Sequence, residues 1–286
     1  MIYSYLKNLQ KNKVIFIIFS VIFIALSVIH IFYSEGYADL IKSLDPSEIH
    51  FIPISIYYYV QSSMTSIQLT LLLFIASSNI FAVDKLIDKQ SHFSILTKLR
   101  VNPNKYYKNM LLINSVYSFV YYLIIQITII FTLFILIGTF DFSQLEQNDI
   151  QAYYNLFSNS YQNSFFIYLI FSSLGFVIYS DFIYSLSTWI KNIYVYRGSG
   201  LIIGILLTAL PAIICGSIFN LTNSDLFLYI GSLFFLPNLI NPGLQPFVNH
   251  TIFQSPYLTY LTTLLFYCIM LLILSLLSKR KERNYE

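Results

Sequence analysis

Charged side chains are scarce in this chain. Only 10% of its 286 residues are Asp, Glu, Lys or Arg, whereas 57% are hydrophobic. A soluble domain carries about a quarter charged residues, so this composition excludes an ordinary soluble globular protein. The 16 Lys and Arg exceed the 13 Asp and Glu by only three, and such a small excess does not favour nucleic acid as a partner. The sequence therefore predicts an integral membrane protein.

Residues and motifs that support catalysis or metal binding are also few. The chain has only two cysteines, Cys215 and Cys268, and both lie in long apolar runs, where a thiol usually packs as a small hydrophobe. The four histidines are scattered, and the sequence has no zinc motif, nucleophile elbow or phosphate loop. We therefore expect no metal site, cofactor or covalent chemistry in this chain. Any ATP and Mg must be bound by another polypeptide.

Long uncharged stretches predict an all-α membrane protein with six transmembrane helices. About 20 helical residues cross the roughly 30 Å hydrocarbon layer. The predicted spans cover about 14–33, 60–83, 110–139, 163–189, 198–219 and 258–277. Pro53 is expected to precede the second span, and Pro211 to kink the fifth. The apolar run at about 226–241 is too short to cross and is interrupted by proline, which predicts a re-entrant element. Residues 1–286 form a single membrane domain.

The positions of Lys and Arg predict the orientation of these spans. If the N-terminus is cytoplasmic and six helices cross the membrane, every Lys and Arg except Lys42 lies on the cytoplasmic side. Basic residues are enriched in cytoplasmic loops. The pattern therefore places both termini in the cytoplasm.

The segment between the second and third spans contains a predicted surface helix. Ser91 can cap a short helix in which Phe93, Leu96, and Leu99 or Arg100 share one face. Val101, Asn102 and Pro103 would end it. Two interpretations remain open for its apolar ridge and basic neighbours: contact with anionic lipid, or docking of a partner protein.

This segment resembles the loop after the second span of ABC-2 type permeases, the membrane subunits of ATP-driven exporters. The matching residues are Asp84, Asp88, Ile95, Leu96, Leu99, Pro103, Lys105 and Lys108. Met1 to Lys13 resembles the family's amphipathic interfacial helix, because Ile2, Leu6 and Leu9 share one face. Residues 226–241 resemble its re-entrant hairpin. Gln90 and Ser91 differ from the family, which often has a glycine at this place.

The resemblance implies a bacterial export permease that binds a cytoplasmic ABC ATPase subunit, a second permease protomer and membrane lipid. The short helix would be the coupling helix that docks on the ATPase. The implied coupling residues are Ser91, Phe93, Leu96, Leu99, Arg100, Pro103 and Lys191. The expected cargo is an amphipathic or antimicrobial peptide, a toxin, a drug or a lipid, moved for export or self-immunity. The alternatives are a membrane-embedded sensor without an ATPase and, less favoured, a membrane enzyme.

Polar residues inside the predicted spans are the remaining candidates. They can bind neighbouring helices or a second protomer, or they can line a substrate route. These residues are Gln61, Ser62, Thr65 and Gln68 on the second span, and Asn114 and Gln126 on the third. Asp181 is a carboxylate within the fourth span. It has either a local ion-pairing role with Lys191 or Arg197, or a coupling or proton role.

Overall fold

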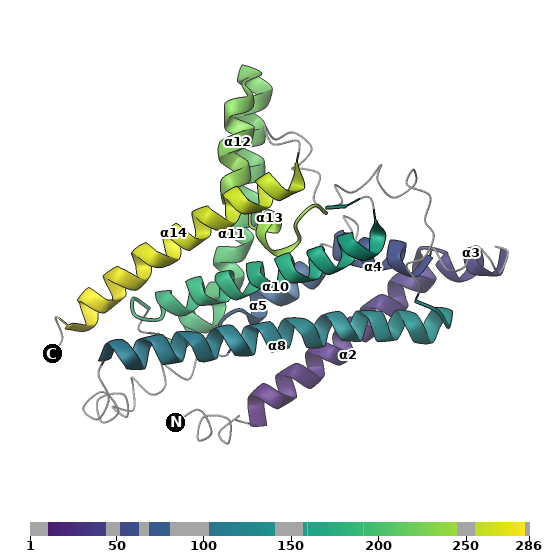
Figure 1. Cartoon of the computed structure of the whole chain (residues 1–286), viewed down its shortest axis with the longest axis horizontal. Coiled ribbons are helices and arrows are strands. Elements are labelled where there is room, and N and C mark those ends of the chain that lie inside the picture. The colour runs from purple at the N-terminus through teal and green to yellow at the C-terminus, as the bar shows by residue number, and fades with distance from the viewer. Residues whose placement is uncertain are drawn as a thin grey trace.

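The computed structural model describes residues 11–43, 52–62, 69–80, 103–140, 157–158, 160–190, 192–244 and 255–283, which form helices joined by turns and short irregular segments (Figure 1). No strand occurs within these ranges. The helices are α2 (Lys11–Ser34), α3 (Tyr37–Ser43), α4 (Ile52–Ser62), α5 (Leu69–Ser77), α8 (Pro103–Ile137), α10 (Tyr161–Leu186), α11 (Ile193–Thr222), α12 (Asp225–Phe234), α13 (Pro237–Ile240) and α14 (Pro256–Arg283).

Five of these helices, α2, α8, α10, α11 and α14, are long and apolar enough to cross a membrane. They coincide with the first, third, fourth, fifth and sixth predicted spans, so the chain is a multi-pass membrane protein. The third begins earlier than expected, at Pro103 instead of Met110. Proline suits the first turn of a helix, where its missing N–H leaves no backbone bond unmade. Most of the predicted interfacial helix at 1–13 lies outside the described residues.

The second predicted span was wrong at both ends. A helix begins at Ile52 instead of Val60, and it includes Pro53 in its first turn, where proline is tolerated. Further along, α5 ends at Ser77 and is followed by a turn at 78–80, which interrupts the predicted helix before Val83. At this end the hydroxyls of Ser77 and Ser78 donate to carbonyls three residues back, and such bonds compete with helix continuation. Residues 63–68 lie outside the described part.

Helix α10 lies at the centre of the bundle and packs against α8, α14, α13 and α11. Half of its most apolar stretch is buried inside the protein, compared with 11% for α11. Its contact with α13 is a contact between backbones: a Cβ added at Gly175 would lie 1.8 Å from the carbonyl oxygen of Leu239. Ser172 adds a hydrogen bond from its hydroxyl to the carbonyl of Ile240, at 2.6 Å. Glycine at 175 therefore allows α13 to sit directly on α10.

A similar close approach joins α5 to α11. A Cβ at Gly200 would lie 2.2 Å from Ser78 Oγ, and one at Gly204 would lie 2.2 Å from Ile75 Cγ2. The hydroxyl of Tyr179 on α10 donates to the carbonyl of Gly200 at 2.6 Å. Small residues let membrane helices approach closely, so this pair of glycines allows α5 to pack against the first half of α11.

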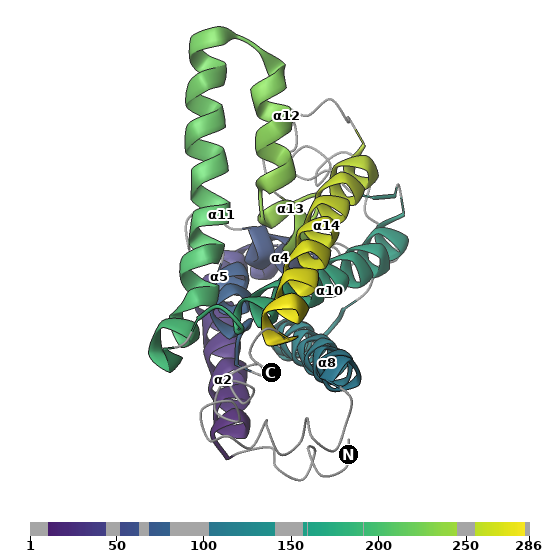
Figure 2. The same cartoon turned by 90° about the vertical axis from the view of Figure 1, so that its left-hand side faces the viewer.

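Helices α11 and α12 form a hairpin that projects from the rest of the bundle (Figure 2). Pro211 lies inside α11, which continues unbroken to Thr222. The turn is made at Asn223, whose backbone is left-handed with φ of 50°, a conformation that Asn tolerates better than most residues. The chain then returns along α12 to the buried α13. The region predicted as re-entrant, 226–241, thus consists of these two short helices.

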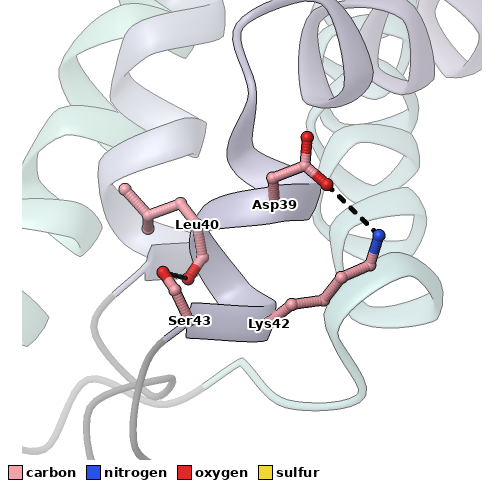
Figure 3. Close-up of polar contacts among 4 residues, drawn as sticks. All are labelled: Asp39, Leu40, Lys42 and Ser43. Atoms are coloured by element: carbon pink, nitrogen blue, oxygen red, sulfur yellow. Dashed lines mark hydrogen bonds and ion pairs between the residues drawn. The ribbon is translucent and has the colours of Figure 1, made fainter.

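The basic start of α8 and the basic end of α14 lie on one side of the molecule. In Figure 1 both are on the left, whereas α3 lies on the right. Helix α3 has no fully buried residue, and its exposed Lys42 Nζ pairs with Asp39 Oδ1 at 3.2 Å (Figure 3). Lys42, the one basic residue that the sequence predicts on the far side, therefore lies away from the basic ends of these helices.

Candidate functional site

Asp181 is buried where α10 packs on α8, with only 6% of its surface exposed. Asn114 Nδ2 donates to its Oδ1 at 2.8 Å, and Ser115 Oγ donates to its Oδ2 at 2.6 Å. No Lys, Arg or His in the described part forms an ion pair with this carboxylate, and Arg197 is exposed. Lys191 lies outside the described residues. The predicted pairing with Arg197 is thus not formed, and neutral side chains from α8 contact Asp181 instead.

The polar contacts continue from Asp181 to the turn after α5. Ser180 Oγ accepts bonds from Asn114 Nδ2 at 3.1 Å and from Ser118 Oγ at 2.8 Å. Its own hydroxyl donates to the carbonyl of Ser78 at 2.7 Å. We call Ser78, Asn114, Ser115, Ser118, Ser180 and Asp181 the aspartate cluster. It links α8, α10 and the turn after α5 in an otherwise apolar interior, where an unpaired polar group is costly.

Asn79 joins the same turn to the start of α11. Its Nδ2 donates to the carbonyls of Tyr196 and Arg197, at 2.5 and 2.6 Å. The hydroxyl of Tyr196 in turn donates to the carbonyl of Ile183 on α10, at 3.3 Å. The segment with most of the predicted coupling residues begins directly after this turn, at residue 81. Any displacement of that segment would act on the turn that holds α11 in place.

A second polar group, formed by Tyr57, Gln61, Gln126, Tyr168 and Asn241, lies further along α8, and we call it the amide cluster. Gln126 Oε1 accepts bonds from Gln61 Nε2 at 2.5 Å and from Tyr57 Oη at 2.8 Å. Asn241 Nδ2 donates to the backbone carbonyl of Gln61 at 3.0 Å, and Tyr168 Oη donates to Asn241 Oδ1 at 3.5 Å. Gln61 and Gln126 are at most 1% exposed. These two side chains bond each other, which favours their interpretation as helix-packing residues.

The structure brings together two pairs of the predicted residues, Gln61 with Gln126 and Asn114 with Asp181. The pairs are separated by about 18 Å along α8. Pro103 is the first residue of α8. The other predicted site residues cannot be placed: Ser91, Phe93, Leu96, Leu99, Arg100, Lys191, Thr65, Gln68 and the side chain of Ser62 lie outside the described part.

Sequence reasoning missed Ser115, Ser118, Ser180 and Asn79. The sequence contained a signal for two of them, Ser118 and Ser180. Ser118 lies four residues after Asn114 and therefore shares its helix face. Ser180 also directly precedes the single carboxylate of its span. Nothing in the sequence, however, indicated that these two faces meet.

The described residues contain no group of three or more His, Cys, Asp or Glu side chains that could hold a metal ion. No protein-family model, curated protein or solved structure matches this chain. The two buried polar clusters and the segment at 81–102 are therefore the features from which a function has to be argued.

Replacing Gln126 by leucine is expected to destabilise the fold by about 2 kcal/mol, because Tyr57 Oη and Gln61 Nε2 would both lose their acceptor while still buried. Gln61→Leu removes one of those donors, so it should cost less. Thermal unfolding of the detergent-purified variants measures both. Equal losses for the two variants would show that Gln126 Oε1 is not the shared acceptor.

Proposed function

We propose that this chain is the membrane permease subunit of an ATP-driven ABC exporter of the second type in the cytoplasmic membrane of a bacterium. It would act as a dimer of identical or related protomers and would bind a separate cytoplasmic ATPase subunit. Its cargo would be an amphipathic or antimicrobial peptide, a toxin, a drug or a lipid, moved outward for export or self-immunity. The permease would perform no covalent chemistry itself.

The observation that carries this proposal is the segment from Asp84 to Lys108, with its acidic start, short amphipathic helix and basic end. Two features of the fold support it. The segment leads directly into a spanning helix, because α8 begins at Pro103. Two short helices, α12 and α13, lie between the last two spanning helices, at the place where the resemblance implies a re-entrant hairpin. A sensor without an ATPase has no comparable support among these features.

The proposed mechanism is transmission of ATPase closure through this segment to the spanning helices. The turn at 78–80 immediately precedes the segment, and Asn79 bonds two carbonyls at the start of α11. The same turn accepts a bond from Ser180 of α10 through the carbonyl of Ser78. A pull on the segment would thus reach α10 and α11 together. Movement of α11 and of the second-span region against the other protomer would alternately open a route between the two subunits.

Affinity capture of the tagged chain from native membranes, in mild detergent, tests the proposal. We expect a stoichiometric partner that contains a phosphate-loop motif and hydrolyses ATP. Its hydrolysis rate should rise several-fold when it is reconstituted with the permease in lipid nanodiscs. Capture of the intact permease without any such ATPase, after expression together with its neighbouring genes, would contradict the proposal and favour the sensor.

A further inference from the structure

Ser115 has one hydroxyl hydrogen and two acceptors within reach. Its Oγ lies 2.6 Å from Asp181 Oδ2 and 2.9 Å from the carbonyl oxygen of Leu111. A serine hydroxyl can donate only one hydrogen at full strength. If Asp181 is ionised, only one of these two short contacts can therefore be a hydrogen bond. In the other contact two oxygens face each other without a hydrogen between them, which is costly in a buried, apolar setting.

The other side chains of the aspartate cluster also have no spare hydrogen to donate to Asp181. The two amide hydrogens of Asn114 are directed to Asp181 Oδ1 and Ser180 Oγ. The hydroxyl of Ser118 donates to Ser180, which donates to the carbonyl of Ser78. Every hydrogen on the side chains that contact Asp181 is thus already in use. Asn114 Oδ1 is nevertheless buried without a donor.

One additional proton resolves the contact at Ser115. A proton on Asp181 Oδ2 would be donated to Ser115 Oγ, and the Ser115 hydroxyl would then donate to the carbonyl of Leu111. Both short distances would contain a hydrogen, and Asp181 Oδ1 would still accept from Asn114. The carboxyl group would also be neutral, which removes the cost of a lone charge within a membrane-spanning helix.

No cation in the described part compensates an ionised Asp181. Ser115 and Asn114 are its only side-chain partners there. Helices α5 and α13 contain no titratable residue. Near the level of Asp181, the packed helices carry the following titratable or cationic residues: Tyr107, Lys108, Tyr117, Tyr121 and Tyr122 on α8, Tyr179 and Tyr184 on α10, Tyr196 and Arg197 on α11, and Tyr267, Cys268 and Arg280 on α14. Lys108, Arg197 and Arg280 are exposed, and the side chain of Lys279 lies outside the described part.

We propose that Asp181 is an intramembrane proton-binding site, which at neutral pH holds a proton between its Oδ2 and Ser115 Oγ. The protonated form closes the contact between α8 and α10. Loss of the proton leaves an uncompensated charge and one unfilled hydrogen bond at this contact, so the two helices pack less tightly. The site thereby makes the packing of the central helix dependent on protonation. This inference does not require the transport function proposed above.

Infrared difference spectroscopy of the purified chain in lipid nanodiscs tests the site directly. A protonated carboxyl group has a carbonyl stretch above the amide band, and an ionised carboxylate does not. We expect this band at neutral pH in the wild-type protein and its loss in Asp181→Asn. The matched control is Asp225→Asn, which removes an acid at the exposed first turn of α12 and should leave the band unchanged. Ser115→Ala should shift the band, because the proton loses its acceptor.

The pH dependence of unfolding provides a second readout. The proposed site binds its proton more tightly in the folded than in the unfolded chain, so wild-type stability should fall as pH rises. The side chain in Asp181→Asn stays neutral at every pH, so the stability of this variant should not show this part of the decrease as pH rises. The proposal is overturned if the neutral-pH band is the same in wild type and Asp181→Asn. It is also overturned if the wild type gains stability relative to that variant as pH rises.

Discussion

Replacing Gly175 by alanine is expected to prevent most of the protein from folding. The added Cβ would lie 1.8 Å from the carbonyl oxygen of Leu239 and 2.7 Å from its carbon, and both atoms are backbone. A side chain could rotate away from such a contact, but here the whole of α13 must move. Overpacking a well-packed interior typically reduces the free energy of unfolding by about 1–3 kcal/mol. We expect a clash with backbone atoms to cost at least as much as the upper end of that range. The yield of monodisperse protein in size-exclusion chromatography and the thermal unfolding midpoint measure the effect.

Gly216→Ala is the matched control for this substitution. Gly216 also lies inside a spanning helix, α11, but a Cβ there meets no atom within 4 Å. Alanine is favoured over glycine in a helix interior by about 1 kcal/mol, so this variant should be as stable as the wild type or slightly more stable. If Gly175→Ala and Gly216→Ala unfold at the same temperature, the close contact between α10 and α13 does not exist in the folded protein.

Replacing Phe93, Leu96 and Leu99 together by serine is expected to abolish stimulation of the partner ATPase, while the permease still folds. These residues form the apolar ridge of the predicted coupling helix, and the proposed function requires that ridge to dock on the ATPase. Removal of three apolar anchors from one small interface should eliminate most of its binding energy. The ATPase rate of the reconstituted complex and the amount of co-purified ATPase are the measurements.

A control variant should change surface residues of the same kind on the side of the molecule opposite to the start of α8 (Figure 1). Helix α3 offers Leu40, which is 46% exposed, and Lys42, whose pairing with Asp39 lies at the surface (Figure 3). Exposed ion pairs contribute little to stability, so Leu40→Ser combined with Lys42→Ala should preserve both folding and ATPase stimulation. If the triple serine variant also preserves stimulation, the segment contacts lipid and does not couple the ATPase.

Hydropathy was enough to place the five described helices that are long and apolar enough to cross a membrane, because each fills one uncharged stretch of about the length that the hydrocarbon layer requires. It failed for the second predicted span. The uncharged run around that span is longer than one helix, and hydropathy alone does not show where a helix begins or ends within it. Pro53 and the polar end at Ser77 and Ser78 set boundaries that depend on local hydrogen bonding.

The candidate site was predicted only in part, for a related reason. The sequence identified Asn114, Gln126, Gln61 and Asp181 as unusual, because amide and carboxylate side chains are rare within these spans. It left open whether they face another helix or a substrate route, and it offered Arg197 as a partner for Asp181. The fold instead directs neutral donors of α8 at Asp181 and pairs the two glutamines.

The sequence by itself determined that this is a multi-pass helical membrane protein, and it predicted the side on which most basic residues lie. Both properties depend on residues that are close in the chain. Only the tertiary structure decided that Gly175 is where α13 contacts α10, that Asn79 holds the start of α11, and that Asp181 is buried without a cation among the described residues. Spanning helices are apolar on every side, so their composition shows that they are buried in lipid or protein but does not specify which neighbour each face will meet.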